Sequence, residues 1–229
     1  MTISNDSRTR IKKVFEPIAL GMGRLGLTPD GLTLIGFGIT AVGALLLSQG
    51  LWLAGGLVVF IGGVFDMFDG TLARATGKVS PLGAFMDSVF DRWGEALVYL
   101  GIVVGCTLAA FDTGAILAAA AMGSAFMVSY TRSKSEGLGF TAGTGMAAIG
   151  VMPREVRLVI LCLGLVLAPT PISEAVPPGQ ACAGLCDAFQ GGSLTVALAV
   201  IFIGATITVI QRILHVRSQA KSAAVISTK

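Results

Sequence analysis

The chain has 229 residues, of which 54% are hydrophobic and only 13% are charged. Charged residues make up about a quarter of a typical soluble protein, so this composition excludes an ordinary soluble enzyme or binding module and indicates one compact membrane domain over residues 1–229. The formal net charge of +3 suits contact with anionic lipid headgroups. We therefore expect membrane lipids, and no nucleic acid, among the partners.

The first 27 residues contain neither a cleavable signal peptide nor a spanning segment, because a proline interrupts the short mixed run that follows four basic residues. Apolar residues recur at helical spacing between Ile11 and Met22. This pattern predicts an amphipathic helix within residues 1–27, lying on the inner membrane surface. Thr28 and Pro29 then suit the N-cap and the first turn of a new helix.

Six apolar runs approach the length of about 20 residues that a helix needs to cross a bilayer. They cover residues 32–53, 54–75, 83–110, 114–131, 151–168 and 193–214. We therefore predict an all-α fold with six transmembrane helices in a core over 28–215 and a cytoplasmic tail over 216–229. With the N-terminus inside, all sixteen Lys and Arg residues lie on the cytoplasmic side or in the cytoplasmic half of a helix. The pattern predicts a multi-pass protein of the cell membrane with both termini cytoplasmic.

Four aspartates interrupt the apolar sequence at the inner ends of the second and third predicted spans. At 100° per residue, Asp66 and Asp69 lie about 60° apart on a helix, and Asp87 and Asp91 lie about 40° apart, so each pair shares a face. Gly, Ser and Pro residues within 75–82 predict a turn between the pairs. The two helices can therefore return antiparallel with the four carboxylates facing one another at the cytosolic end.

This aspartate quartet predicts a metal site. Ionised carboxylates at membrane depth cost at least a few kcal/mol each and repel one another, so a divalent cation is expected among them. Oxygen ligands without Cys or His favour Mg²⁺, Mn²⁺ or Ca²⁺, and four carboxylates are enough to bridge two ions. The alternative is a set of helix-end aspartates paired with Arg74, Lys78 and Arg92. Those three cations would leave one carboxylate uncompensated.

The segment from Asp66 to Asp91 reads D-x2-D-G-x2-A-R-x8-G-x3-D-x3-D. It resembles the signature of the CDP-alcohol phosphotransferase (CDP-alcohol phosphatidyltransferase) family at every fixed position. The resemblance implies attack by an acceptor alcohol on the lipid-bearing phosphorus of CDP-diacylglycerol or a related CDP-lipid, with CMP leaving and two Mg²⁺ or Mn²⁺ ions at the site. It implies Asp66, Asp69 and Asp87 as metal ligands, Asp91 as the general base that also contacts a metal, and a homodimer.

The small residues Gly70 and Ala73 leave room for a bulky group beside the aspartates. The resemblance identifies that group as the CDP moiety. The residues that it places against the CDP-lipid are Pro29, Asp30, Thr33, Asp69, Gly70, Ala73, Arg74, Lys78 and Gly83.

A second basic group lies at the ends of the fourth, fifth and sixth predicted spans. It consists of Arg132, Lys134, Arg154, Arg157 and Arg212. These residues are either flanking charges of the inner leaflet or a pocket for an acceptor phosphate, which arginine forks match well. Free inositol, serine or choline would not need such a pocket.

The pattern around these basic residues resembles the phosphatidylinositol-phosphate and archaetidylinositol-phosphate synthase branch, which implies inositol phosphate as the acceptor. Two features depart from that branch. Arg132 and Lys134 stand where Lys and then Arg are expected, and Pro153 precedes both arginines of the fifth span rather than lying between them. Glycerol-3-phosphate therefore remains an alternative acceptor.

Intramembrane aspartates also occur in cation transporters, which form an alternative of a different class. A transport pathway requires acidic or polar groups toward the outer face. Apart from Glu95, the outer halves of these helices carry no charged residue. Cys182 and Cys186 lie in the predicted outer loop, and the sequence leaves open whether they form a disulfide.

Overall fold

The computed structural model describes residues 16–140, 149–168 and 192–227, and within these ranges every regular element is a helix. The labelled helices are α2 (Pro29–Ser48), α3 (Trp52–Thr76), α4 (Pro81–Leu108), α5 (Asp112–Gly137), α6 (Arg154–Val166) and α8 (Ser193–Ser227). A short helix also covers residues 16–24. The all-α prediction is confirmed for the described residues. Cys182, Cys186 and their predicted loop lie outside them.

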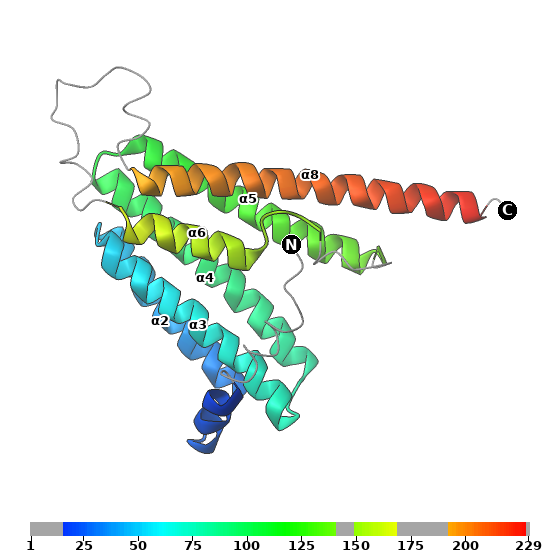
Figure 1. Ribbon diagram of the computed structural model, residues 1–229, viewed down its shortest axis with the longest axis horizontal. Coiled ribbons are helices and arrows are strands. Elements are labelled where there is room, and N and C mark those ends of the chain that lie inside the picture. Colours follow the sequence, from blue (N-terminus) through cyan, green and yellow to red (C-terminus); the bar gives the residue numbers. More distant parts are fainter. Residues whose placement is uncertain (1–15, 141–148, 169–191, 228–229) are drawn as a thin grey trace.

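The six labelled helices pack in a ring, in the order α2, α3, α6, α8, α5, α4 and back to α2. Figure 1 shows α2, α3 and α4 side by side, α5 and α8 running together, and α6 between the two groups. The centre of the ring is apolar, with Trp52, Tyr99, Ile102, Leu165 and Leu198 all buried. This arrangement joins segments far apart in the chain at one end of the bundle.

Large apolar side chains cover the outside of the helices as well. Exposed apolar side chains occur on five different helices, for example Leu45, Phe60, Leu100, Ile116 and Ile203. A soluble protein rarely exposes apolar residues so generally, whereas a helix surrounded by lipid does. The outer surface therefore agrees with a membrane protein.

Four helices are long and apolar enough to cross a membrane, judged by length and composition alone: α2, α3, α5 and α8 over Ser193–Lys221. The predicted spans 83–110 and 151–168 correspond to α4 and α6, which do not meet this criterion. α4 is long enough but carries four charged residues between Asp87 and Glu95, and α6 has only 13 residues, which make about 20 Å of helix. The described residues thus support several membrane helices without establishing six spans.

Two predicted boundaries differ from the structure. The break between the first two spans was expected at 53/54, whereas α2 ends at Ser48 because Gly50 adopts a positive φ of 73° that ends the helix. The last helix continues through the predicted tail to Ser227 and has 35 residues, about 50 Å in length. Apolar periodicity detects neither a local turn nor a helix that continues with polar residues.

Side-chain caps position the two helix starts that border the aspartates. Thr28 Oγ1 accepts a hydrogen bond from Gly31 N at 3.1 Å, and Ser80 Oγ accepts one from Gly83 N at 3.0 Å. A proline follows each cap as the first helical residue. Gly77 ends α3 in the left-handed conformation, with φ of 67°. The predicted Thr28 cap and the predicted turn within 75–82 are both confirmed.

The helix over residues 16–24 packs against the start of α2 and the end of α3. Its Ala19 is fully buried in a cluster with Leu32, Phe68 and Leu72, and Met22 packs at the edge. Residues 16–24 of the predicted amphipathic segment are thus helical, and the position of this helix on the membrane surface stays a prediction. Residues 1–15 lie outside the described part of the chain.

Candidate active site

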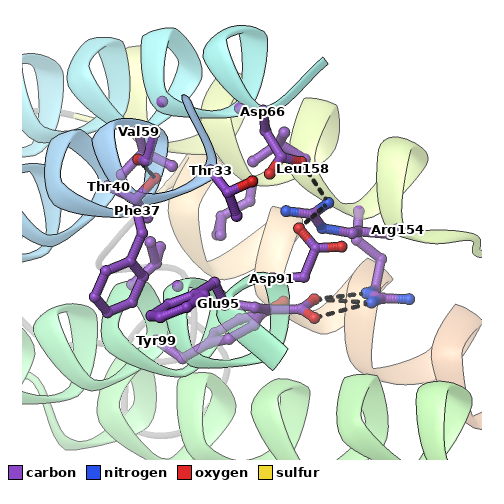
Figure 2. Close-up of a pocket in the computed structure, with 18 residues that line it drawn as sticks. Thr33, Phe37, Thr40, Val59, Asp66, Asp91, Glu95, Tyr99, Arg154 and Leu158 are labelled. Atoms are coloured by element: carbon purple, nitrogen blue, oxygen red, sulfur yellow. Dashed lines mark hydrogen bonds and ion pairs between the residues drawn. The ribbon is translucent and has the colours of Figure 1, made fainter. Parts of the chain in front are cut away.

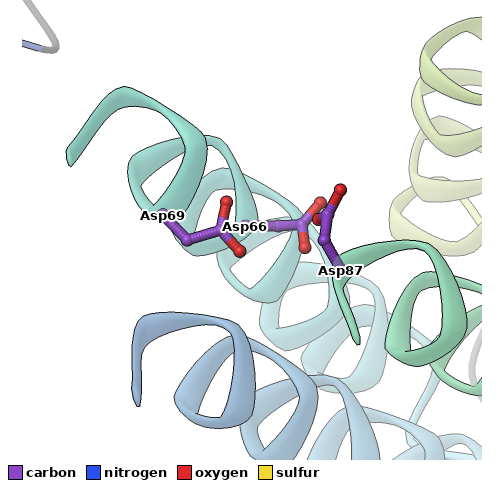
Figure 3. A group of neighbouring side chains, drawn as sticks. All are labelled: Asp66, Asp69 and Asp87. Atoms are coloured by element: carbon purple, nitrogen blue, oxygen red, sulfur yellow. The ribbon is translucent and has the colours of Figure 1, made fainter. Parts of the chain in front are cut away.

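Three of the four aspartates come together where α3 and α4 face each other. One carboxylate oxygen from each of Asp66, Asp69 and Asp87 lies within 4.8 Å of the other two (Figure 3). Among the described residues, no ion pair reaches Asp69 or Asp87. Three convergent carboxylates, two of them without an ion pair, fit a hard divalent cation such as Mg²⁺ or Mn²⁺.

Asp69 is the most constrained of the three carboxylates. It is 6% exposed, and its Oδ2 accepts a hydrogen bond from Thr33 Oγ1 of α2 at 2.5 Å. Its Oδ1 accepts a second bond from the backbone N–H of Gly70. These bonds fix the direction of the carboxylate, and Thr33 joins the start of α2 to the aspartate group.

Asp91 lies beside this group and is held by arginines instead. Arg154 Nη1 lies 2.5 Å from Asp91 Oδ1 and 2.9 Å from Asp66 Oδ2, so one nitrogen bridges the two aspartates (Figure 2). Arg92 Nη2 lies 3.4 Å from Asp91 Oδ2. In the described structure the ion pairs of the quartet involve Arg92 and Arg154, and neither Arg74 nor Lys78. Of the predicted alternative pairings, only the one with Arg92 is present.

A cavity of about 260 Å³ adjoins the aspartates between the start of α2, the end of α3 and the start of α4. All nine residues expected at the CDP-lipid line it: Pro29, Asp30, Thr33, Asp69, Gly70, Ala73, Arg74, Lys78 and Gly83. The structure thus brings three separate segments to one concave surface.

Two glycines of the signature have close neighbours in this cavity. A Cβ on Gly83 would lie 3.1 Å from Ser80 Oγ and 3.3 Å from Asp30 Oδ1. A Cβ on Gly70 would lie 3.3 Å from Arg74 Nη1. A larger residue at either position would displace a polar side chain that lines the cavity, which explains the small residues physically.

The second basic group is divided among several environments. Arg132 lines an open cavity of about 730 Å³ that also borders Asp87 and Asp91. Lys134 is exposed to solvent nearby. Arg154 bridges the aspartates, as described above.

Arg157 and Arg212 are buried and donate to the protein itself. Arg157 is 2% exposed and Arg212 is 4% exposed. The Arg157 guanidinium binds Glu95 with three contacts of 2.8–3.1 Å. Arg212 Nε donates to Ile149 O at 3.0 Å, and its Nη1 donates to Val128 O. In this geometry, protein oxygens accept from all three guanidinium nitrogens of Arg157 and from Nε and Nη1 of Arg212.

Sequence reasoning did not assign a role to Glu95 or Ser129. Glu95 binds Arg157 and Arg92, and Ser129 of α5 accepts a hydrogen bond from Arg92. One signal was present, because Glu95 lies four residues after Asp91 and so shares its helix face. The contact with Ser129 depends on the packing of α4 against α5, which sequence spacing does not reveal.

Residues 26–215 match the family model of CDP-alcohol phosphatidyltransferases. An archaetidylinositol phosphate synthase of Pyrococcus horikoshii is 38% identical over 154 residues, which are 67% of this chain and 77% of the relative. The resemblance expected from the Asp66–Asp91 signature is therefore confirmed.

Solved structures agree with the fold. The crystal structure of Mycobacterium tuberculosis phosphatidylinositol phosphate synthase with CDP-DAG bound is 29% identical, with a TM-score of 0.72 over 89% of this chain and 94% of that chain. The same enzyme in complex with manganese and citrate is 28% identical, with a TM-score of 0.70 over 88% of each chain.

Proposed function

Because the chain belongs to the CDP-alcohol phosphatidyltransferase family, we propose that it transfers the lipid-phosphate group of CDP-diacylglycerol, or of a related CDP-lipid, to a hydroxyl of inositol phosphate and releases CMP. The observation that carries this proposal is one cavity lined by all nine expected CDP-lipid residues, next to three convergent aspartates. The M. tuberculosis synthase of similar fold was crystallised with CDP-DAG bound.

The donor site is the cavity of about 260 Å³ between α2, α3 and α4. Arg74 and Lys78 on its wall suit the negative charge of a pyrophosphate. Because Gly70 and Gly83 have no side chain, a nucleotide can approach the backbone at these two positions. Pro29 and Asp30 close the cavity from α2.

The metal site is formed by Asp66, Asp69 and Asp87, with Asp91 at its edge. We propose two Mg²⁺ or Mn²⁺ ions, in line with the manganese complex of the M. tuberculosis enzyme. Bound cations supply positive charge for the phosphate oxygens and the departing CMP. Thr33 and the Gly70 N–H hold Asp69 in a fixed direction for this purpose.

Asp91 is the proposed general base. It borders the open cavity of about 730 Å³ on the side away from the donor site, so an acceptor hydroxyl there can deliver its proton to this carboxylate. Asp87, which lines both the donor cavity and this larger cavity, lies one turn before Asp91 and connects the two proposed sites.

The acceptor site is this larger cavity, which contains the hydroxyl groups of Ser129, Tyr130 and Ser133 and the guanidinium groups of Arg92 and Arg132. Hydroxyls with arginines suit a phosphorylated polyol. Within the proposed acceptor group, Arg132, Lys134 and Arg154 are the nearer cations. Arg157 and Arg212 contribute positive charge from buried positions. Glycerol-3-phosphate would use the same cations but fewer hydroxyls.

The membrane arrangement is also a proposal. The second half of α3, the starts of α4 and α6, the end of α5 and the middle of α8 bring the aspartates and the basic group to one end of the ring. We propose that this end is cytoplasmic, that all six ring helices of residues 28–215 span the membrane, and that the helix over 16–24 lies on the inner surface. Both termini are then cytoplasmic, in a single domain over 1–229 that forms a homodimer.

The decisive experiment offers the purified protein CDP-diacylglycerol, Mg²⁺ and a panel of acceptors, and measures CMP. We expect inositol phosphate to give the highest kcat/KM, glycerol-3-phosphate to follow, and free inositol, serine and choline to be poor. Preference for a neutral alcohol would refute the proposed acceptor. Ion flux without CMP release would favour the transporter alternative instead.

A further inference from the structure

Glu95 is a buried carboxylate that the proposed reaction does not use. It lies on α4, one turn after Asp91, and 11% of its side chain is exposed. It lines a small cavity of about 50 Å³ that Asp66, Asp91 and Arg154 also line (Figure 2). A carboxylate in such a position is costly unless cations pair with it. Its partners therefore indicate its role.

The first partner is Arg157 of α6. Arg157 Nε lies 3.0 Å from Glu95 Oε1, and its Nη2 lies 2.8 Å from Oε1 and 3.1 Å from Oε2. The remaining nitrogen, Nη1, donates to Met152 O at 3.1 Å. The guanidinium is thus held by four contacts in a fully buried position, which fixes the first turn of α6.

Fixing Arg157 also fixes Arg154. The two arginines are three residues apart in the first turn of α6, so they share a helix face. α6 packs mainly against α3 and α8, so its alignment with α4 depends on the ionic contacts at its start. The Glu95–Arg157 pair supplies one of these contacts, and the pair of Arg154 with Asp91 supplies another.

The second partner is Arg92. Its Nη1 lies 3.0 Å from Glu95 Oε2 and also donates to Ser129 of α5. Its Nη2 lies 3.4 Å from Asp91 Oδ2. Both cations that touch Asp91, namely Arg92 and Arg154, are therefore held directly or indirectly by Glu95.

We propose that Glu95 is a positioning residue of this transferase. By binding Arg92 and Arg157 together, it keeps Arg92 and Arg154 on either side of Asp91 and so sets the direction of the Asp91 carboxylate. The network pairs three carboxylates with three guanidinium groups, and removal of Glu95 leaves an uncompensated positive charge beside the site. The inference rests on the proposed function, because that function assigns Asp91 the acceptor proton.

The kinetic test compares the wild type with Glu95→Gln and Glu95→Asp. As a matched control, Glu155→Gln makes the same change at an exposed position on the first turn of α6. We expect Glu95→Gln to lower kcat at least tenfold with the KM for the CDP-lipid within twofold of the wild type, since Glu95 is absent from the donor cavity. Glu95→Asp, which keeps the charge, should recover most of kcat, and the control should match the wild type.

An unchanged kcat in Glu95→Gln overturns the proposal. So does a loss that appears equally in the KM for the CDP-lipid, because that result indicates general damage to the fold. A Glu95→Asp variant no better than Glu95→Gln also counts against it, since charge rather than side-chain volume holds the arginines.

A second measurement does not depend on turnover. The Tm of the full-length protein in detergent is measured for Glu95→Gln, Arg157→Gln and the double variant. We expect the double variant to lose less Tm than the sum of the two single losses, because the second change removes the charge that the first leaves unpaired. Additive losses would overturn the proposed pairing of Glu95 with Arg157. A wild type that releases no CMP would instead refute the proposed function, while the Tm values of these variants would still test the pairing.

Discussion

Thr33 Oγ1 of α2 lies 2.5 Å from Asp69 Oδ2 of α3, and this buried hydrogen bond joins the donor cavity to the proposed metal ligands. A bond to a charged group contributes about 1.5–3 kcal/mol. Residues that orient metal ligands commonly change metal affinity by about 10–100-fold when they are replaced. The contact therefore has a measurable consequence.

Thr33→Val should weaken Mn²⁺ binding about tenfold or more, because it keeps the shape of the side chain but removes the donor to Asp69. Mn²⁺ titration followed by electron paramagnetic resonance measures this directly. Thr71→Val is the control, since Thr71 Oγ1 donates only to Met67 O within its own helix at 2.8 Å. Equal Mn²⁺ affinity in the two variants would contradict a role for Thr33 in orienting Asp69.

Asp87 and Asp91 should respond differently to the same substitution. Asp87 belongs to the convergent group of three carboxylates, whereas Asp91 is held by Arg154 and Arg92. Asp87→Asn should therefore abolish CMP release and weaken Mn²⁺ binding. Asp91→Asn should retain CDP-lipid binding and lower kcat at least about a hundredfold, the scale of losing a positioned base.

The measurements for this pair are Mn²⁺ affinity, CDP-lipid affinity and CMP release in each variant, with excess chelator added to the wild type. Chelator should stop wild-type turnover. Turnover that persists in chelator would contradict the metal site, and a loss of Mn²⁺ binding in Asp91→Asn equal to that in Asp87→Asn would make Asp91 mainly a metal ligand.

Gly83→Ala should raise the KM for the CDP-lipid about tenfold with little change in the KM for the acceptor. The added Cβ would lie 3.3 Å from Asp30 Oδ1 and 3.1 Å from Ser80 Oγ, so both groups must shift within the donor cavity. Gly38→Ala is the matched control, because a Cβ there meets no heavy atom within 4 Å. Steady-state kinetics with each substrate varied in turn decide the outcome, and an unaltered KM for the CDP-lipid would argue against the cavity as donor site.

Of the four predicted aspartates, the sequence foresaw the convergence of Asp66, Asp69 and Asp87 because its geometry is local. Spacing of three and four residues on helices, with a capped turn between them, brings Asp66, Asp69 and Asp87 together without any knowledge of the remaining fold. The donor cavity also follows from neighbouring helices, since α2, α3 and α4 are consecutive.

The basic group was harder to interpret because its members lie on α5, α6 and α8, whose relative positions come from ring packing. Five cations at one membrane level look alike in sequence. The structure distinguishes Arg132, which faces the larger cavity, from Arg212, which binds backbone oxygens of Ile149 and Val128. Spacing places Glu95 on the helix face of Asp91, but its pairing with Arg157 of α6 depends on the packing of the ring.

Arg132 and Arg212 therefore give the last prediction. Arg132 is half exposed, and its guanidinium pairs with Glu136 at 3.0 Å at the edge of the acceptor cavity. Arg132→Ala should raise the KM for inositol phosphate about tenfold or more, as expected for loss of a charge-assisted bond of about 1.5–3 kcal/mol. Its Tm and its KM for the CDP-lipid should remain near wild type, because the side chain is outside both the packed core and the donor cavity.

Arg212→Ala should behave differently, since it removes the hydrogen bonds that this arginine donates to Ile149 O and Val128 O, and a hydrogen bond with a charged partner contributes about 1.5–3 kcal/mol. Its main effect should be a lower Tm of the protein in detergent. Lys221→Ala, at an exposed position on the same helix α8, is the control for loss of a positive charge. If Arg132→Ala leaves the acceptor dependence unaltered while inositol phosphate remains the best substrate, the acceptor phosphate must bind elsewhere, and Arg132 is then an inner-leaflet charge that pairs with Glu136.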